Sequence, residues 1–206
     1  IDNFQYTSDL TAEMGALRSQ AMYLYVQPGI YTDSTYANGA SDAVHLQTYG
    51  ASVVASYIAS EMAKLNSELY AAYTPKAVAA QAPAQPTGLY AKETTGTSAT
   101  ITWDEQVDAD YYVVRYKESA SSNWSEVAAV VYPQATVSGL KAGTSYDFAV
   151  YAYNDAGESA GSNTLTLPKA SSSSEYNKLL NLVTSSKESF EAWRGMYVYT
   201  FGETAN

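Results

Sequence analysis

Cysteine is absent from the chain of 206 residues, and histidine occurs once, as His45. The first absence excludes disulfide bonds, thiolate nucleophiles and cysteine-ligated metals, and it leaves the redox compartment open. A single histidine supplies no histidine cluster for a transition metal, so we interpret His45 as a surface or interface residue. With so few acid–base groups, we expect a protein that is not an enzyme and that holds no cofactor and no metal ion.

Basic residues are also scarce. Eleven Lys and Arg stand against 21 Asp and Glu, which gives a formal net charge of −10. A chain this acidic repels phosphate backbones and anionic membrane surfaces, so binding to nucleic acid or to such membranes is disfavoured. No apolar run approaches the ~20 residues that a membrane-spanning helix needs. No signal peptide is visible, and because the chain starts at Ile1 without a Met, we expect that an upstream segment was removed or omitted.

The first 80 residues are predicted to form the first part of a helical base. Apolar residues at three- and four-residue steps predict a helix over residues 8–26, which Pro28 ends, and a loop after it. A second apolar stripe predicts a helix over residues 41–74, about 50 Å long by its rise per residue. Gly50 is a place where this helix could kink.

The end of the chain, residues 175–206, is predicted to return to helix. Residues 81–85 and 169–174 read as linkers, since they are rich in small residues, Pro and Ser. Apolar residues at helical spacing predict a third helix over residues 175–194, and the alternation over 196–201 indicates a strand-like tail. We assign residues 175–206 to the second part of the helical base.

Residues 86–168 show a different pattern, the two-residue alternation of half-buried strands. The run "SATITW" places Ala99, Ile101 and Trp103 on one face, and "YDFAVYAYN" repeats the pattern. Short antiparallel strands with one apolar face each bury that face by forming a two-sheet sandwich.

This region resembles a fibronectin type III domain. The resemblance rests on Pro86 and Leu89, the tryptophan of "ITW", the strand "YYVVRYK", Trp124, "LKAGTSY" and "AYNDAGES". The spacing Leu140-x-x-Gly143-x-x-Tyr146 is similar to the family's tyrosine corner, in which the hydroxyl bonds nearby backbone. The resemblance implies a seven-stranded sandwich that serves as a spacer, an adhesive module or an interaction module. The adhesive tripeptide Arg-Gly-Asp is missing, so no integrin role carries over.

Two local motifs, an acidic run and a sequon, each have a plainer interpretation than a functional site. The run 104–110 gathers Asp104, Glu105, Asp108 and Asp110, whose oxygens could hold calcium, but it lacks the EF-hand pattern and reads as a solvated acidic loop. Asn123 begins a glycosylation sequon, which matters only if a host glycosylates the protein. A pair of carboxylates of the kind that glycosidases use stays compatible with the sequence, although no nucleophile elbow or phosphate loop is present.

The predicted fold class is therefore α+β, with a fibronectin type III-like seven-stranded β-sandwich inserted into an α-helical domain made of the N- and C-terminal segments. We expect the two helical parts to pack together and the sandwich to project from them. The leading hypothesis is a non-catalytic structural subunit of an extracellular filament or virion that self-associates through its helical base. The expected partners are copies of the chain itself. The predicted assembly interface comprises Ile58, Leu65, Leu69, Phe190, Trp193, Tyr197, Tyr199 and Phe201.

The alternative hypothesis is a carbohydrate- or protein-binding accessory module of a secreted or cell-surface protein. The chain has 20 tyrosines. Most of these rings read as core and strand residues, but aromatic rings in loops and at strand edges can stack on sugars. The candidate rings are Tyr31, Tyr36, Trp124 and Tyr132. An enzyme built on the helical part is the third and weakest hypothesis.

Overall fold

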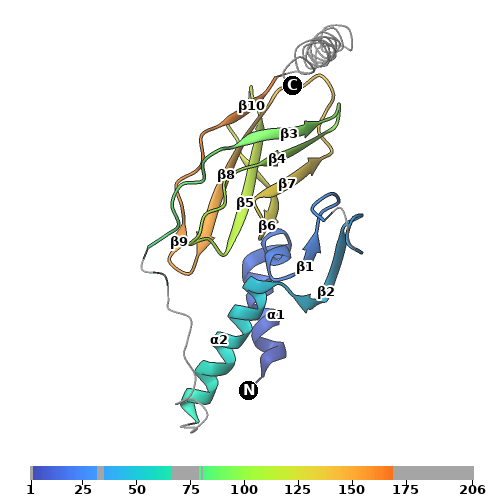
Figure 1. Cartoon of the computed structure of the whole chain (residues 1–206). Coiled ribbons are helices and arrows are strands. Elements are labelled where there is room, and N and C mark those ends of the chain that lie inside the picture. The colour runs from blue at the N-terminus through green and yellow to red at the C-terminus, as the bar shows by residue number, and fades with distance from the viewer. Residues whose placement is uncertain (1, 32–34, 66–78, 80, 169–206) are drawn as a thin grey trace, which may run out of the picture.

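A computed structural model describes residues 2–31, 35–65, 79 and 81–168 (Figure 1). The N-terminal segment comprises helix α1 (Asn3–Arg18), the 3₁₀ turn η1 (Ser19–Ala21), strands β1 (Tyr23–Val26) and β2 (Ala40–Leu46), and helix α2 (Thr48–Lys64). The predicted third helix, the strand-like tail and the linker 169–174 lie outside the described residues. None of the described helices combines the length and the hydrophobicity needed to cross a membrane.

Helix α1 begins and ends earlier than the predicted helix over 8–26. Its start is capped by Asp2, whose side chain accepts a hydrogen bond from the backbone N–H of Gln5 at 2.9 Å. The helix breaks at Gly15, where φ is 76° and ψ is 164°. Residues 23–26, read as helix from their spacing, instead form β1, since Tyr and Val favour strands and a partner strand is available. The prediction is therefore wrong for the end of this helix.

The predicted helix over 41–74 is also wrong in its first turns. Residues 40–46 form β2, which pairs antiparallel with β1, and α2 starts only at Thr48. The side chain of Asp42 accepts hydrogen bonds from the backbone N–H groups of Val44 at 2.9 Å and His45 at 2.7 Å, and this Asx turn competes with helix formation. The described part of the helix ends at Lys64, and residues 66–78 lie outside the described residues.

The sandwich is built from two antiparallel sheets. One holds β3 (Tyr90–Thr94), β4 (Ser98–Thr102) and β7 (Gln134–Ser138) in the order β3-β4-β7. The other has the order β10-β8-β5-β6, formed by β5 (Tyr111–Glu118), β6 (Ser125–Val130), β8 (Tyr146–Asn154) and β10 (Leu165–Leu167). The two-residue strand β9 (Gly157–Glu158) also pairs with β8.

The final strand position of the predicted seven-stranded sandwich is split in two. Strands β9 and β10 pair with opposite ends of β8, so the described residues contain eight strand segments in the sandwich. Between them, the hydroxyls of Ser159 and Ser162 accept hydrogen bonds from the backbone N–H groups of Ala152 and Val150 at 2.9 and 3.0 Å. These serine hydroxyls accept from backbone N–H groups of β8 at the place where the regular strand pairing is interrupted. The interruption divides the last strand into β9 and β10, so eight segments are found where seven strands were predicted.

The sandwich core confirms the expected inward faces. Ile101, Trp103 and Phe148 are buried, and Trp103 meets the ring of Tyr112 edge-on with centroids 5.3 Å apart. The Tyr146 hydroxyl accepts a hydrogen bond from the backbone N–H of Lys141 at 3.0 Å, as the predicted tyrosine corner requires.

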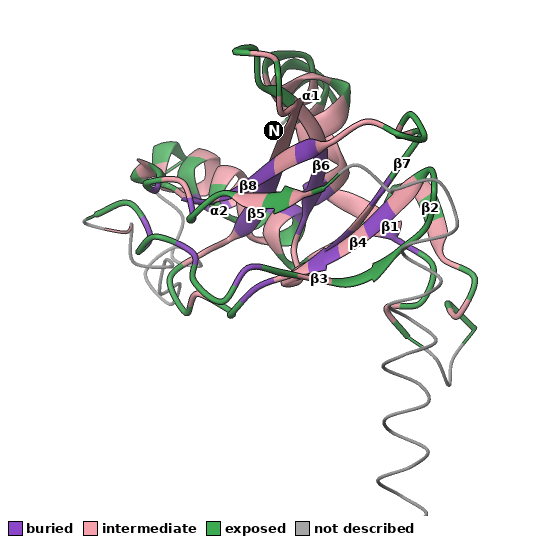
Figure 2. Cartoon of the chain, turned by 90° about the horizontal axis from the view of Figure 1, so that it is seen from above, coloured by how far each residue is buried: buried purple, intermediate pink, exposed green. Residues whose placement is uncertain are grey.

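The sandwich is not held away from the helical segment. Seen from above, α1 and the β1–β2 hairpin lie directly against the outer side of the β8-β5-β6 sheet and the edge at β7 (Figure 2). The expectation of a module projecting from a separate base is therefore wrong for the N-terminal part. The physical reason is that this sheet is apolar on its outer face as well.

Candidate functional site: the docked N-terminal segment and its free helical surface

The outer face of the sheet carries a second hydrophobic core. We call this surface the docked face. Its residues are Tyr111, Val113, Ala129, Tyr151 and Tyr153.

Leu17, Ala21 and Tyr49 of the N-terminal segment cover the docked face. Ala21 and Val113 are both 0% exposed, so these two side chains are fully removed from water. Both faces of the first half of β5 are therefore buried, and the N-terminal segment forms one packed unit with the sandwich.

Aromatic rings make much of this contact. Tyr111 and Tyr153 stack with centroids 5.0 Å apart, and Tyr49 of α2 tilts against Tyr111 at the same centroid distance. Burial raises the pKa of Tyr111 to about 12. Its hydroxyl stays protonated at neutral pH, so this ring contributes packing and hydrogen bonding, and does not act as a base.

Two arginines bind the segment and the sheet together beside the docked face. Arg18 of α1 donates to both carboxylate oxygens of Glu126 on β6, at 2.5 and 3.0 Å. Arg115 of β5 donates to Glu158 at 2.7 Å and to Glu126 at 3.2 Å, and Tyr153 also bonds Glu158. Arg18 and Arg115 also lie over the rings of Tyr153 and Tyr151, 4.9 and 4.0 Å from their centroids. The fork-like pairing fixes the position of α1 on the sheet.

The two arginines stabilise the ionised carboxylate of Glu126. The hydrogen bond from Arg18 is the main cause that lowers the pKa of Glu126, and Arg115 adds to it. A lowered folded-state pKa means that the stabilising contribution is present above the unfolded value of about 4.3 and is lost as the pH falls through the folded value.

We expect Glu126→Gln to lower the free energy of unfolding by about 1–2 kcal/mol at neutral pH, because an ionised acceptor shared by two guanidinium groups becomes neutral. As the pH falls, the wild-type carboxylate is protonated and the difference between the two proteins should shrink. Urea unfolding from about pH 7 to about pH 2 measures this, with exposed Glu93→Gln as the control. An equal difference at both ends of the pH range would contradict the assignment.

A glutamine closes the free edge of the other sheet. The Gln27 side-chain amide donates to the carbonyl of Thr136 on β7 at 3.1 Å and accepts from the Thr136 N–H at 2.6 Å. It thereby pairs with an edge strand as a backbone peptide would. The Gln27 N–H also donates to the hydroxyl of Tyr132 at 2.9 Å, and burial raises the pKa of Tyr132 to about 12.

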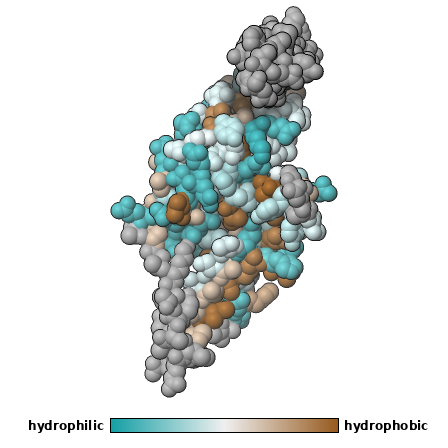
Figure 3. All heavy atoms as spheres, in the orientation of Figure 1, coloured by the Kyte–Doolittle hydropathy of each residue, from teal (hydrophilic) through white to brown (hydrophobic). Residues whose placement is uncertain are grey.

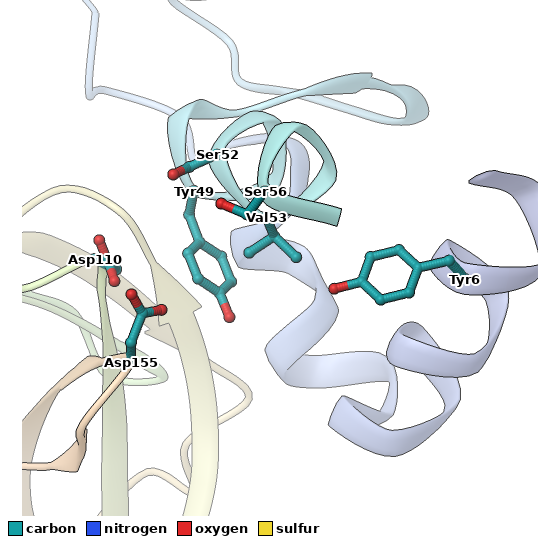
Figure 4. Close-up of a pocket in the computed structure, with 7 residues that line it drawn as sticks. All are labelled: Tyr6, Tyr49, Ser52, Val53, Ser56, Asp110 and Asp155. Atoms are coloured by element: carbon teal, nitrogen blue, oxygen red, sulfur yellow. The ribbon is translucent and has the colours of Figure 1, made fainter. Parts of the chain in front are cut away.

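A cleft of about 250 Å³ lies between the two helices and the adjacent end of the sandwich (Figure 4). It is lined by Tyr6, Tyr49, Ser52, Val53, Ser56, Asp110 and Asp155. Burial is the largest cause that raises the pKa of Tyr49, and the charges of Asp110 and Asp155 raise it further. Both effects raise the pKa of Tyr49 further above neutral pH, so its hydroxyl stays protonated. It can hydrogen-bond a polar group but is not suited to act as a base.

Among the described residues, apolar side chains on and beside the two helices stay exposed next to this cleft. The helices touch through Tyr6 and Tyr57, whose rings stack with centroids 3.9 Å apart. Helix α1 has no buried residue, and Phe4 at its start is 82% exposed. In Figure 3, apolar side chains gather in the lower half of the view, where α1 and α2 lie.

Two of the eight predicted assembly residues lie within the part of the chain that the structure describes. Ile58 on α2 is half-buried, and Leu65, just after α2, is 71% exposed. The other six, Leu69, Phe190, Trp193, Tyr197, Tyr199 and Phe201, lie outside the described residues. The assembly interface as a whole therefore stays a prediction.

The four candidate sugar-binding rings lie in two regions of the described structure, at the β1–β2 hairpin and beside β5. Tyr31 and Tyr36 are exposed in the loop between β1 and β2. The ring of Trp124 has its centroid 5.5 Å from the Nζ of Lys117. Tyr132 is hydrogen-bonded to the hairpin at Gln27 and Tyr25. Sugar binding through these rings stays a prediction.

The remaining sequence motifs lie at the surface. His45 is exposed, and its Nδ1 lies 2.8 Å from the Asp42 carboxylate. Asn123 is exposed as well. In the acidic run, Asp104 accepts a hydrogen bond from Thr87, and the described ranges contain no group of three or more His, Cys, Asp or Glu placed to hold a metal ion.

Two packed antiparallel sheets with a tyrosine corner define an all-β sandwich of the immunoglobulin-like kind. Residues 84–167 match the family model "Fibronectin type III domain", which confirms the family predicted for this part of the chain. This domain is a protein-interaction or structural module, of a kind that is typically non-catalytic.

The curated relatives match less than half of this chain. A stretch of 78 residues is 37% identical to the receptor-type tyrosine-protein phosphatase F of Danio rerio, covering 36% of this chain and 4% of that protein. A titin homolog of Caenorhabditis elegans is 34% identical over 86 residues, covering 39% of this chain and a share of its own length that rounds to 0%. This chain therefore spans only a small part of both relatives.

Solved structures match a similar share of this chain. A Fn3-like protein from Clostridium thermocellum is 29% identical with a TM-score of 0.39, covering 45% of this chain and 100% of that one. Domains A168–A170 of titin are 26% identical with a TM-score of 0.40, covering 42% of this chain and 32% of that one.

Proposed function

We propose that this protein is a non-catalytic structural subunit of an extracellular filament or virion, which self-assembles through its helical part and presents the fibronectin type III domain at the surface of the assembly. Its main partners are further copies of the same chain. The observation that carries this proposal is the exposed apolar surface on the described part of the two helices, together with the packing of these helices against the sandwich.

The apolar stripe of α2 supports self-association. Val54, Ile58, Met62 and Leu65 follow one another at helical spacing. Val54 is 8% exposed, Ile58 and Met62 are half-buried, and Leu65 is 71% exposed, so the stripe emerges from the protein along the helix. We call these four residues the α2 stripe. A stripe of this kind gains stability when another apolar surface covers it.

The attachment of the segment to the sandwich suits a structural role. The docked face, the Arg18–Glu126 pair and the Gln27–Thr136 pairing hold the N-terminal segment at three places. Force or contact applied to the helices is therefore transmitted directly to the sandwich. In such an arrangement the loops at the far end of the sandwich, around Ser119–Asn123 and Lys141–Ser145, are free to face outward.

Electron microscopy and light scattering of the purified full chain over a range of concentrations test this function. We expect ordered polymers or closed rings that grow with concentration. A protein that stays monomeric at the highest concentration, with no particles on the grid, would overturn the proposal.

A further inference from the structure

Two tyrosine rings join helix α1 to helix α2. Tyr6 of α1 and Tyr57 of α2 lie parallel, with ring centroids 3.9 Å apart and an angle of 3° between the ring planes. Rings in this arrangement touch face to face, so carbon atoms of one ring lie about 3.5–4 Å from carbon atoms of the other. The two phenols are therefore already placed next to each other, although 51 residues separate them in the chain.

Solvent reaches this pair of rings. Both residues are half-buried. Tyr6 lines the cleft of about 250 Å³ and directs its hydroxyl toward it (Figure 4). The hydroxyl of Tyr57 lies 3.4 Å from the carbonyl oxygen of Asp2, in an exposed hydrogen bond. A dissolved oxidant can therefore approach the pair, and a proton that leaves either hydroxyl can pass to water.

A second tyrosine pair in the same protein lacks these properties. Tyr111 and Tyr153 also stack, but their centroids are 5.0 Å apart and each residue is only 7% exposed. The hydroxyl of Tyr153 accepts hydrogen bonds from Arg18 and Arg115. This pair is farther apart and closed to solvent, so the chemistry open to Tyr6 and Tyr57 is not open to it.

We propose that Tyr6 and Tyr57 form an oxidative cross-linking site, at which a dityrosine bond joins α1 to α2. The oxidant is hydrogen peroxide acting through a haem peroxidase. Each phenol gives up one electron and its hydroxyl proton, and the two radicals couple through the ring carbons beside the hydroxyls to form one C–C bond. Each of these carbons then releases its hydrogen as a proton, and each ring oxygen takes up a proton from water. One peroxide accepts the two electrons and two protons and becomes two waters.

The cross-link would replace a kind of bond that this chain cannot make. Cysteine is absent, so no disulfide can connect the two helices. Helix α1 has no buried residue, and its start meets α2 at this ring pair. A covalent bond there closes a loop through the hairpin and restricts the unfolded chain, as a disulfide does in other proteins. The site lies within one chain and does not depend on self-assembly.

Oxidation of the dilute full chain with a haem peroxidase and an equal amount of hydrogen peroxide tests the proposal. The monomer is isolated under denaturing conditions and cleaved after Lys and Arg, which separates residues 1–18 from residues 19–64. Tyr6 is the only tyrosine of the first fragment. We expect mass spectrometry to find the two fragments linked, with a mass lower than their sum by two hydrogen atoms, and to place the second end of the link on Tyr57.

Two full-length variants make the test specific. Tyr57→Phe keeps a ring that can stack on Tyr6 but has no hydroxyl to lose a hydrogen, so we expect the linked fragment to disappear. Tyr31→Phe is the matched control, because Tyr31 is 50% exposed and belongs to the same fragment, residues 19–64. It should give the linked fragment in the yield of the wild type.

The remaining outcomes contradict the proposal. A linked fragment that persists in Tyr57→Phe, or that joins Tyr6 to another tyrosine in the wild type, overturns it. So does a wild-type monomer without the linked fragment, or oxidation that joins only separate molecules. These measurements are made on the monomer, so none of them decides whether the protein assembles.

Discussion

Val113→Lys is expected to lower the free energy of unfolding by about 3–5 kcal/mol. Val113 is 0% exposed on the docked face, where it packs with Ala21 and Ala129. A lysine there needs more volume than the packed site allows, and its ammonium group would lie on the same face of β5 as Arg115. No carboxylate of the network is free to neutralise it, because Glu126 and Glu158 already pair with arginines.

The matched control is Val107→Lys, which introduces the same charge at a valine that is 97% exposed. Urea unfolding of both variants measures the difference, and we expect the control to stay within about 0.5 kcal/mol of the wild type. In a sandwich with an uncovered outer face, lysine at residue 113 would point into water. A small effect there would therefore mean that the N-terminal segment does not cover this sheet.

Gly50→Ala should lower the free energy of unfolding by about 2–3 kcal/mol. A Cβ at this position would lie 2.1 Å from the carbonyl oxygen of Met22 and 2.8 Å from its carbonyl carbon. These are backbone atoms, and the Met22 carbonyl is also the acceptor for the N–H of Gln47, so neither chain can yield without breaking a contact. Helix α2 must then move away from the turn at Met22.

The direction of this effect is informative, because Ala is favoured over Gly in an exposed helix by about 1 kcal/mol. Ala51→Gly at the neighbouring exposed position should lose about that amount, and Gly96→Ala, which meets nothing within 4 Å, should be nearly neutral. Chemical unfolding of the three variants gives the comparison. A Gly50→Ala protein that is more stable than the wild type would show that α2 is not packed against Met22.

The sandwich could be predicted from sequence because its strands alternate and its turns carry local signals. Trp103, Tyr146 and Phe148 lie where the two-residue pattern placed them, and the tyrosine corner forms. The split last strand could not be predicted, since it depends on two serine hydroxyls that replace ladder contacts across β8.

The β1–β2 hairpin was missed for a physical reason. Leu17, Ala21 and Leu24 continue a helical spacing, but a single Gly15 with positive φ breaks the helix, and Asp42 turns the chain at β2. The spacing of apolar residues reveals neither the break at Gly15 nor the turn at Asp42. Tertiary pairing of β1 with β2 then overrides the local pattern.

The docked face has a signal in the sequence, which the predicted fold does not include. The strand "YYVVRY" is apolar on both faces, with Tyr112 and Val114 on one side and Tyr111 and Val113 on the other. A strand of this kind is covered on both sides. Arg18, Glu126 and Gln27 carried no such signal, because their roles depend on partners about a hundred residues away in the chain.

Differential scanning calorimetry of the full chain can show whether the N-terminal segment and the sandwich form one packed unit, as the second hydrophobic core between them implies. We predict that both unfold in a single transition, with no earlier transition for the segment, and that Val113→Lys lowers the midpoint of that transition or separates it into two. Two well-resolved transitions in the wild type, with the sandwich transition unaffected by Val113→Lys, would contradict the claim.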